Sequence, residues 1–255
     1  MPRQRYLRDF RVKMQQNEEE KKSIDAGSAT LLKGATILVI AGIVSKIFGA
    51  VFRIPLTNMI GAEGQSYYSA AYAVYNLLFV IATAGFPVAI SRMVSSRIAE
   101  GDFINAHKSY KLAMKVSWAL GIVSFLVMYF GAGAIAGFYK NPGSEASMKA
   151  ISVALLFTPL VASMRGYYQG RQDMKPTGIT EVIEQMVRVA AGLSLAYMFY
   201  RTSLVNAAAG ATFGASAGIM AALLAMALAL TLTPALAASS LTFTQGVRLD
   251  LFDQE

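Results

Sequence analysis

The sequence of 255 residues contains no cysteine and a single histidine, His107. Without cysteine the chain can form no disulfide, no thiolate metal site and no cysteine nucleophile, and one histidine is too few for a metal site of several histidines. Charged residues are also scarce, at 15% of the chain, against about 25% in an ordinary soluble domain. This composition argues against a soluble enzyme.

Hydrophobic residues make up 55% of the chain, and three long stretches carry no charge: residues 64–90, 116–139 and 202–247. Each exceeds the roughly 20 residues that a helix needs to cross the hydrocarbon core of a membrane. Hydropathy and helix-breaking residues predict six transmembrane helices, at about 31–59, 65–98, 108–138, 147–170, 177–200 and 203–232. The predicted fold class is therefore all-α, a polytopic membrane protein built as a six-helix bundle in the lipid bilayer.

The sequence divides into three regions. A tail of mixed charge, residues 1–29, precedes the predicted bundle of residues 30–232, and residues 233–255 form an atypical C-terminal tail. Of the 23 Lys and Arg, 7 lie in the first tail, interleaved with acidic residues. This pattern is typical of a solvated segment that contacts anionic lipid, and it predicts no nucleic-acid partner despite the net charge of +8.

The positions of Lys and Arg predict the orientation in the cell membrane. The tail, the gap after the second helix and the gap after the fourth carry 7, 5 and 3 of them, the last being Arg165, Arg171 and Lys175. The intervening gaps carry 0, 2 and 1. By the positive-inside rule the N-terminus is cytoplasmic, and an even number of helices returns the C-terminus to the same side.

Two cations lie inside the first predicted helix. Lys46 and Arg53 are seven residues apart, which places them on one face about 10 Å apart along the axis. An ionised group within a membrane is costly unless it faces water, a partner or a ligand. The pair predicts an internal hydrated cavity for a phosphate or pyrophosphate group. Alternatively, Arg53 extends to the membrane interface and Lys46 pairs with a carboxylate.

The fifth predicted helix carries Glu181, Glu184 and Arg188 on one face, at positions i, i+3 and i+7. Glu184 and Arg188 are four residues apart, with the acid first, so they can pair within the helix. Glu181 is then freer and lies nearer the cytoplasmic end. These residues form either a structural ion pair or a gate or proton site.

The second predicted helix carries aromatic and amide side chains at three-to-four spacing, namely Tyr68, Tyr72, Tyr75 and Asn76. Such a stripe can bind a sugar or a polar headgroup in a cavity. Tyr67 and Tyr68 are equally typical of anchors at the membrane interface. Both interpretations stay open at this point.

Catalytic motifs are missing. The sequence has no glycine-rich phosphate loop followed by Lys-Ser or Lys-Thr, and no paired carboxylates of the kind that a glycosyltransferase needs. His107 lies in a polar stretch and is interpreted as a solvated loop residue. We therefore predict a protein that is not an enzyme and that has no cofactor or metal.

Three segments carry a resemblance to a known family: SKIFGAVFRIPLTNMIGAEGQSYYSAAYAVYN (45–76), AGFPVAISRMVSSRIAEGD (84–102) and RGYYQGRQDMKPTGITEVIEQMVRV (165–189). They resemble the oligosaccharide flippase and polysaccharide biosynthesis protein family, in the group of stage V sporulation protein B. This group belongs to the multidrug/oligosaccharidyl-lipid/polysaccharide exporter superfamily and is related to the lipid II flippases. The resemblance covers about residues 31–230, whereas the sequence after Ala229 does not resemble the family.

The resemblance implies two lobes of six or more helices around a central cavity that opens alternately to either side. The implied cargo is a polyprenyl-pyrophosphate-linked saccharide for cell-wall, peptidoglycan or polysaccharide synthesis. In the lipid II flippases the first helix carries two arginines in the cavity. Arg53 matches the second, whereas Lys46 replaces the first at a spacing one residue longer. The implied substrate-binding set is Arg53, Lys46, Tyr68, Tyr72 and Asn76.

The chain has the length of one lobe, so we expect it to be the N-terminal half of a flippase, through truncation or an altered reading frame. Alternatively, the lobe forms a homodimer through the glycine stripe of the sixth helix, Gly210, Gly214 and Gly218. Two other functions stay open. One is a drug or cation antiporter with Glu181 as the ion site, and the other is a membrane scaffold that recruits partners of wall synthesis through residues 1–29.

Overall fold

A computed structural model describes the backbone of residues 2–252 and the side chains of residues 32–102 and 104–232. Its elements are α1 (Pro2–Thr83), α2 (Phe86–Ala99), α3 (Phe103–Phe138), α4 (Ser144–Gly170), α5 (Lys175–Tyr200) and α6 (Leu204–Phe252). No strand occurs within residues 2–252, so the predicted all-α class is confirmed.

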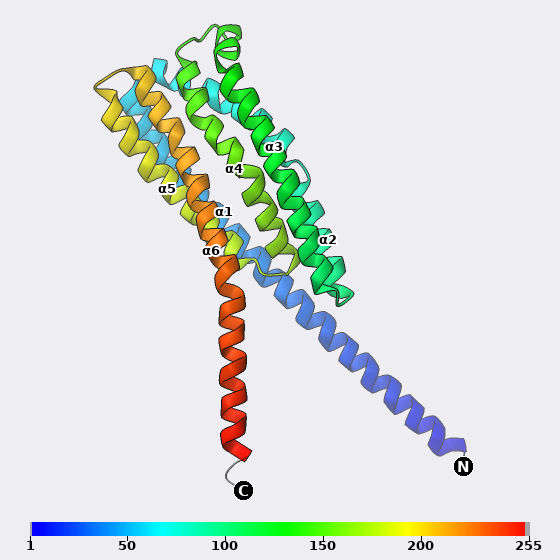
Figure 1. Cartoon of the computed structure of the whole chain (residues 1–255). Coiled ribbons are helices and arrows are strands. Elements are labelled where there is room, and N and C mark those ends of the chain that lie inside the picture. Colours follow the sequence, from blue (N-terminus) through cyan, green and yellow to red (C-terminus); the bar gives the residue numbers. More distant parts are fainter. Residues whose placement is uncertain (1, 253–255) are drawn as a thin grey trace.

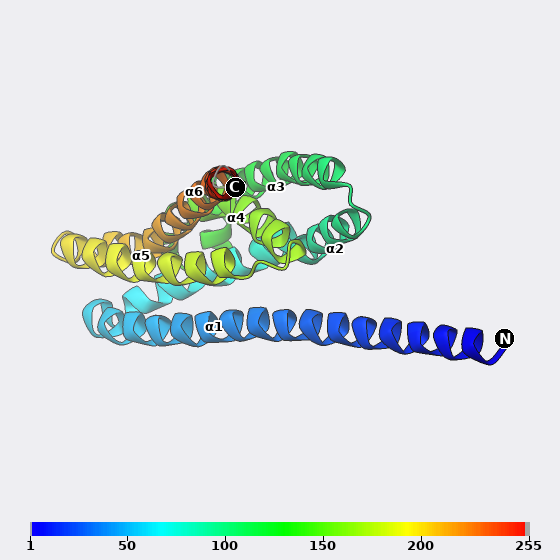
Figure 2. The same ribbon diagram turned by 90° about the horizontal axis from the view of Figure 1, so that it is seen from below.

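Helix α1 consists of two helices that meet at one glycine. Gly61 has φ 63° and ψ −168°, a backbone conformation that only glycine adopts readily. The chain turns back at this residue (Figure 2), so residues 2–60 form a first arm and residues 62–83 a second arm. The predicted gap of residues 60–64 is thus too long, because a single glycine in this conformation redirects the chain without a longer loop.

The predicted second helix, residues 65–98, is interrupted as well. The second arm ends at Thr83, and α2 begins after Gly85, whose φ is 74°. Pro87 lies in the first turn of α2, where its missing N–H costs no helical hydrogen bond. A continuous helix over residues 65–98 was therefore a wrong prediction.

Five helical stretches are long and apolar enough to cross a membrane within the described side chains, rather than the predicted six. The first of them, Leu32–Ala99, is 68 residues long and includes the reversal at Gly61, so it holds both of the first two predicted helices. Helices α3, α4 and α5 begin and end within two turns of their predicted bounds. Helix α6 continues beyond residue 232 to Phe252.

The first and last helices project from the same end of the bundle (Figure 1). Figure 1 shows the start of α1 and the end of α6 projecting from one end, where the α2–α3 and α4–α5 turns also lie. The reversal at Gly61 and the α3–α4 and α5–α6 turns lie at the opposite end (Figures 1 and 2). The chain therefore passes along the bundle an even number of times, as a multi-pass membrane protein.

Helix α4 occupies the centre of the bundle. Of its most apolar stretch 67% is buried, against 11–33% in the other four spans. Leu155 of α4 is fully buried in a core with Met128 of α3 and Ala222 of α6. In contrast, Phe130 and Phe138 of α3 are 75% and 86% exposed. An apolar exterior around a buried central helix is the arrangement expected of a bundle in lipid.

The glycine stripe of α6 packs directly on α5. A Cβ at Gly214 would lie 2.6 Å from the Cα of Gly192, and a Cβ at Gly218 would lie 2.6 Å from the carbonyl oxygen of Glu184. Gly210 approaches the backbone of Leu195 in the same way. The small residues thus let two helices of one chain approach closely. Because α5 covers this stripe, a homodimer would have to use another surface.

Candidate anion-binding cavities

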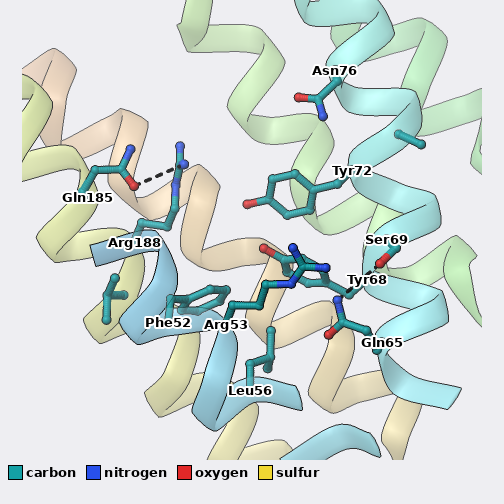
Figure 3. Close-up of a pocket in the computed structure, with 13 residues that line it drawn as sticks. Phe52, Arg53, Leu56, Gln65, Tyr68, Ser69, Tyr72, Asn76, Gln185 and Arg188 are labelled. Atoms are coloured by element: carbon teal, nitrogen blue, oxygen red, sulfur yellow. Dashed lines mark hydrogen bonds between the residues drawn. The ribbon is translucent and has the colours of Figure 1, made fainter. Parts of the chain in front are cut away.

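A cavity of about 440 Å³ opens between the two arms of α1 and helix α5. We call it the Arg53 cavity (Figure 3). The first arm contributes Gly49, Phe52, Arg53 and Leu56, the second arm contributes Gln65, Tyr68, Ser69, Tyr72, Ala73 and Asn76, and α5 contributes Gln185, Arg188 and Val189.

A second cavity, of about 360 Å³, lies between the second arm, α4 and α5. We call it the Glu184 cavity. Its polar lining includes Thr83, Thr158, Arg165, Gln169 and Glu184. Four further residues line both cavities, namely Tyr72, Asn76, Gln185 and Arg188. The two cavities therefore share a wall, and we call their polar lining residues together the polar track.

Arg53 is held at its cavity by the apolar residues beside it on the first arm. Phe52 is 5% exposed and packs against Gly192 of α5, and Leu56 is fully buried in the same core. Arg53 is exposed and projects toward Tyr68 and Gln65 of the second arm (Figure 3). Within the described side chains, Arg53 forms no ion pair or hydrogen bond, so its charge is uncompensated.

The facing wall of the Arg53 cavity is aromatic and polar. The rings of Tyr68 and Tyr72 lie 4.5 Å apart between centroids. Gln65 donates a hydrogen bond to Ser69 at 3.3 Å. The structure thus places the predicted residues Tyr68, Tyr72 and Asn76 in one cavity with Arg53.

The Glu184 cavity contains a cluster of three charges. Arg188, one turn further along α5, donates to Glu184 Oε1 at 2.8 Å, and Arg165 of α4 donates to Oε2 at 3.0 Å. The Glu184 side chain is 9% exposed, and each arginine side chain is 22% exposed. The Nε atoms of both arginines are buried and have no hydrogen-bond partner in the part of the chain that is described.

Sequence reasoning missed Arg165. The positive-inside count assigns it to a cytoplasmic gap, whereas the structure places it within α4, facing Glu184 from 19 residues away. One signal was present, because Arg165 falls inside the predicted helix of residues 147–170. Gln65 and Gln185, which also line the Arg53 cavity, were missed because polar uncharged residues are common in membrane helices.

Two predicted site residues lie outside these cavities. Lys46 is exposed on the first arm, two turns from Arg53, and lines neither cavity. Glu181 is half-buried on α5 and also lines neither cavity. The spacing predicts that Lys46 and Arg53 line one cavity, but the Arg53 cavity extends along only part of the first arm and does not reach Lys46.

The electrostatics of the two cavities favour an anion. Arg53, Arg165 and Arg188 oppose the single carboxylate of Glu184, which leaves two positive charges uncompensated along the track. Guanidinium groups in a partly buried site bind carboxylate and phosphate oxygens strongly. Residues 32–102 and 104–232 contain no group of three His, Asp or Glu that could hold a metal ion. The polar track therefore has the chemistry of a binding site for a phosphate-bearing ligand.

Comparison with known protein families finds a match over residues 31–246 to the family described as polysaccharide biosynthesis protein. This range covers most of the chain. It also extends past Ala229, so the prediction that the later sequence does not resemble the family was wrong. The family match includes the whole of both cavities.

Three curated proteins of Bacillus subtilis (strain 168) are similar to the chain. The lipid II flippase MurJ is 34% identical over 73% of this chain, and the uncharacterized membrane protein YabM is 33% identical over 70%. Stage V sporulation protein B is 30% identical over 71%. The matches cover 36%, 33% and 35% of these relatives, so the chain spans about a third of their length. No solved structure matches.

Proposed function

The chain belongs to the polysaccharide biosynthesis protein family of flippases and polysaccharide exporters, and we propose that it is the N-terminal lobe of a flippase for lipid-linked saccharides. The cargo is a polyprenyl-pyrophosphate-linked saccharide for cell-wall or polysaccharide synthesis. The lobe lies in the cell membrane with its N-terminus in the cytoplasm, as the distribution of Lys and Arg predicts.

The observation that carries the proposal is the uncompensated charge of Arg53 in a cavity within an apolar bundle. Arg53 is exposed in this lobe, but a cation inside a membrane span is costly unless it faces water, a partner or a ligand. A pyrophosphate group would remove that cost by accepting hydrogen bonds from Arg53. Tyr68 and Tyr72 provide an aromatic surface for a sugar ring, and Asn76 provides an amide for sugar hydroxyls. Lys46 is exposed two turns away and is proposed to contact the cargo from outside the Arg53 cavity.

The proposed transport needs no covalent step, so the protein is not an enzyme. A flippase works by binding its cargo in two states that open to opposite sides of the membrane, and the cargo shifts the populations of these states. Cations in the cavity replace the water that surrounds the pyrophosphate in solution. Because this chain provides one lobe, it binds the cargo but requires a second lobe for translocation.

Binding by the purified chain tests the proposal. The chain is placed in lipid nanodiscs, and its affinity for undecaprenyl pyrophosphate is measured at fixed ionic strength. We expect Arg53→Gln to weaken binding by about ten-fold or more, because a hydrogen bond to a charged group is worth about 1.5–3 kcal/mol.

The matched control is Arg201→Gln. This substitution removes an exposed cation in the α5–α6 turn, which lines neither cavity. We expect it to bind like the wild type. If Arg53→Gln also retains wild-type affinity, the cavity assignment is wrong.

A further inference from the structure

The charge cluster around Glu184 is unbalanced. Glu184 shares its two carboxylate oxygens between Arg188 at 2.8 Å and Arg165 at 3.0 Å. One negative charge therefore compensates two positive charges in a largely buried position. A purely structural pair needs only one arginine, and burying the second adds a desolvation cost that its share of one carboxylate has to offset.

Both arginines also retain unused hydrogen-bonding capacity. Each guanidinium has five N–H donors, and each donates to Glu184 through one Nη atom. Arg188 makes one further contact, to Gln185 at 3.4 Å. The Nε donors of Arg165 and Arg188 are buried without a partner in the described part of the chain. An anion with more oxygens than a carboxylate would satisfy these donors better.

Arg165 and Glu184 come from different helices, α4 and α5, and both line the Glu184 cavity. Arg188 lines this cavity and the Arg53 cavity alike. An anion held at Arg53 therefore lies along the same polar track as the charge cluster.

From these observations we propose that Arg165 and Arg188 form a second subsite for a phosphate or pyrophosphate group, and that Glu184 occupies this subsite as an internal counter-ion until the ligand displaces it. The inference deepens the proposed function, on which the identity of the lipid-linked ligand rests. Carboxylate and phosphate oxygens accept the same paired hydrogen bonds from guanidinium groups, so one can replace the other. Glu184 thus reduces the cost of two buried cations when no cargo is bound.

The backbone around Glu184 packs closely against α6, so the exchange is assigned to side chains. Gly218 of α6 packs against the Glu184 carbonyl oxygen, and Gly214 packs against the Arg188 carbonyl oxygen, each closely enough that a Cβ would lie 2.6–2.7 Å away. Helix α5 therefore cannot move away from α6 locally without losing this contact. Rotation of the Glu184 side chain would free Arg165 without disturbing this contact.

The test depends on the sign of one effect. If Glu184 competes with the ligand, Glu184→Gln removes the competing charge and tightens binding of inorganic pyrophosphate by about ten-fold or more, whereas Arg165→Gln weakens it by a similar factor. If Glu184 only holds the helices together, Glu184→Gln leaves the affinity unchanged or weakens it. The second result would overturn the inference.

The matched control is Glu145→Gln. Glu145 pairs with Lys149 at 2.7 Å in the same i, i+4 relation, but this pair is about half exposed and lines neither cavity. We expect Glu145→Gln to bind inorganic pyrophosphate with wild-type affinity. The ligand-induced rise in melting temperature is compared with each variant's own ligand-free value, so a less stable Glu184→Gln protein still gives an answer. Glu184→Asp, with a shorter reach, should bind with intermediate affinity.

A second probe separates this inference from the proposed function. Each variant is also titrated with undecaprenyl pyrophosphate. Suppose that inorganic pyrophosphate binds more tightly to Glu184→Gln and more weakly to Arg165→Gln than to the wild type, while the lipid does not bind. The subsite is then supported and the proposed cargo is wrong. If both probes bind but Glu184→Gln tightens neither, the subsite is wrong and the flippase proposal survives.

Discussion

Tyr72 is the aromatic residue common to both cavities. Its ring lies 4.5 Å from that of Tyr68 and 5.8 Å from that of Tyr75, between centroids. We expect Tyr72→Ala to weaken binding of a polyprenyl-pyrophosphate-linked disaccharide by about three- to ten-fold, because an aromatic contact is worth about 0.5–1.5 kcal/mol. The affinity for undecaprenyl pyrophosphate, which has no sugar, should fall less.

Two variants control this comparison of ligands. Tyr72→Phe keeps the ring and should retain most of the affinity for the disaccharide. Tyr197→Ala removes a ring that is 65% exposed on α5 and should change neither affinity. An equal loss for both ligands in Tyr72→Ala would place the ring at the pyrophosphate and contradict a sugar contact.

At the level of single residues, the sequence identifies the charged residues of the site better than it identifies their ion-pair partners. Arg53, Glu184 and Arg188 stand out because charges are rare in apolar helices, and helical spacing suffices to put Glu184 within reach of Arg188. Arg165 contacts the same carboxylate from another helix, and no spacing rule relates residues 19 apart on separate helices. For Lys46 the spacing gives the face of the helix, whereas the extent of the cavity depends on packing.

At the level of helices, the contact between α5 and α6 depends on glycine. We expect Gly214→Ala to destabilise the protein by about 1–3 kcal/mol, which is typical of overpacking. The added Cβ would meet backbone atoms, namely the Cα of Gly192 at 2.6 Å and the carbonyl oxygen of Arg188 at 2.7 Å, and backbone cannot rotate away. The melting temperature in detergent measures the effect.

Gly137 of α3 provides the control for this substitution. A Cβ at Gly137 would meet nothing within 4 Å, so Gly137→Ala should stabilise its helix by about 0.5–1 kcal/mol through helix propensity alone. Equal melting temperatures for the two variants would mean that α5 and α6 do not approach as closely as the structure has them.

The positions of the helices follow from hydropathy, but their breaks do not. Proline in an apolar run indicates a bend or a helix start equally well, and it is the φ of 74° at Gly85 that decides in favour of a start at Phe86. Similarly, several residues between the first two predicted helices are compatible with a turn, and only Gly61 takes the positive φ. Backbone dihedral angles at glycine are set by tertiary packing, which a single sequence does not reveal.

For the whole molecule, the sequence predicts one lobe of helices but not which helix is central. Helix α4 carries Arg165 and several small polar residues, so hydropathy does not mark it as the most buried span. Small polar residues join it to both neighbours: Ser163 of α4 shares a hydrogen bond with Ser117 of α3, and Ser216 of α6 donates to the carbonyl oxygen of Ala150 of α4 at 2.8 Å. Central position therefore follows from complementary packing with α3 and α6, not from apolar character.

The orientation of the whole lobe gives the last prediction. Because the sequence contains no cysteine, a single introduced cysteine is labelled without background. Glu100 in the α2–α3 turn and Arg201 in the α5–α6 turn are both exposed and lie at opposite ends of the bundle (Figure 1). In intact cells, a maleimide that cannot cross membranes should label Arg201→Cys and spare Glu100→Cys.

Permeabilised cells provide the control, since both cysteines should then be labelled equally. The expected difference follows from the Lys and Arg counts, because the end of the bundle with Glu100 also carries the more basic gaps and the basic first tail. If only Glu100→Cys is labelled in intact cells, the lobe has the opposite orientation in the membrane. It would also place Arg165 and Glu184, which lie nearer that end than Arg53 does, on the outer side of the polar track, so cargo from the cytoplasm would meet Arg53 first.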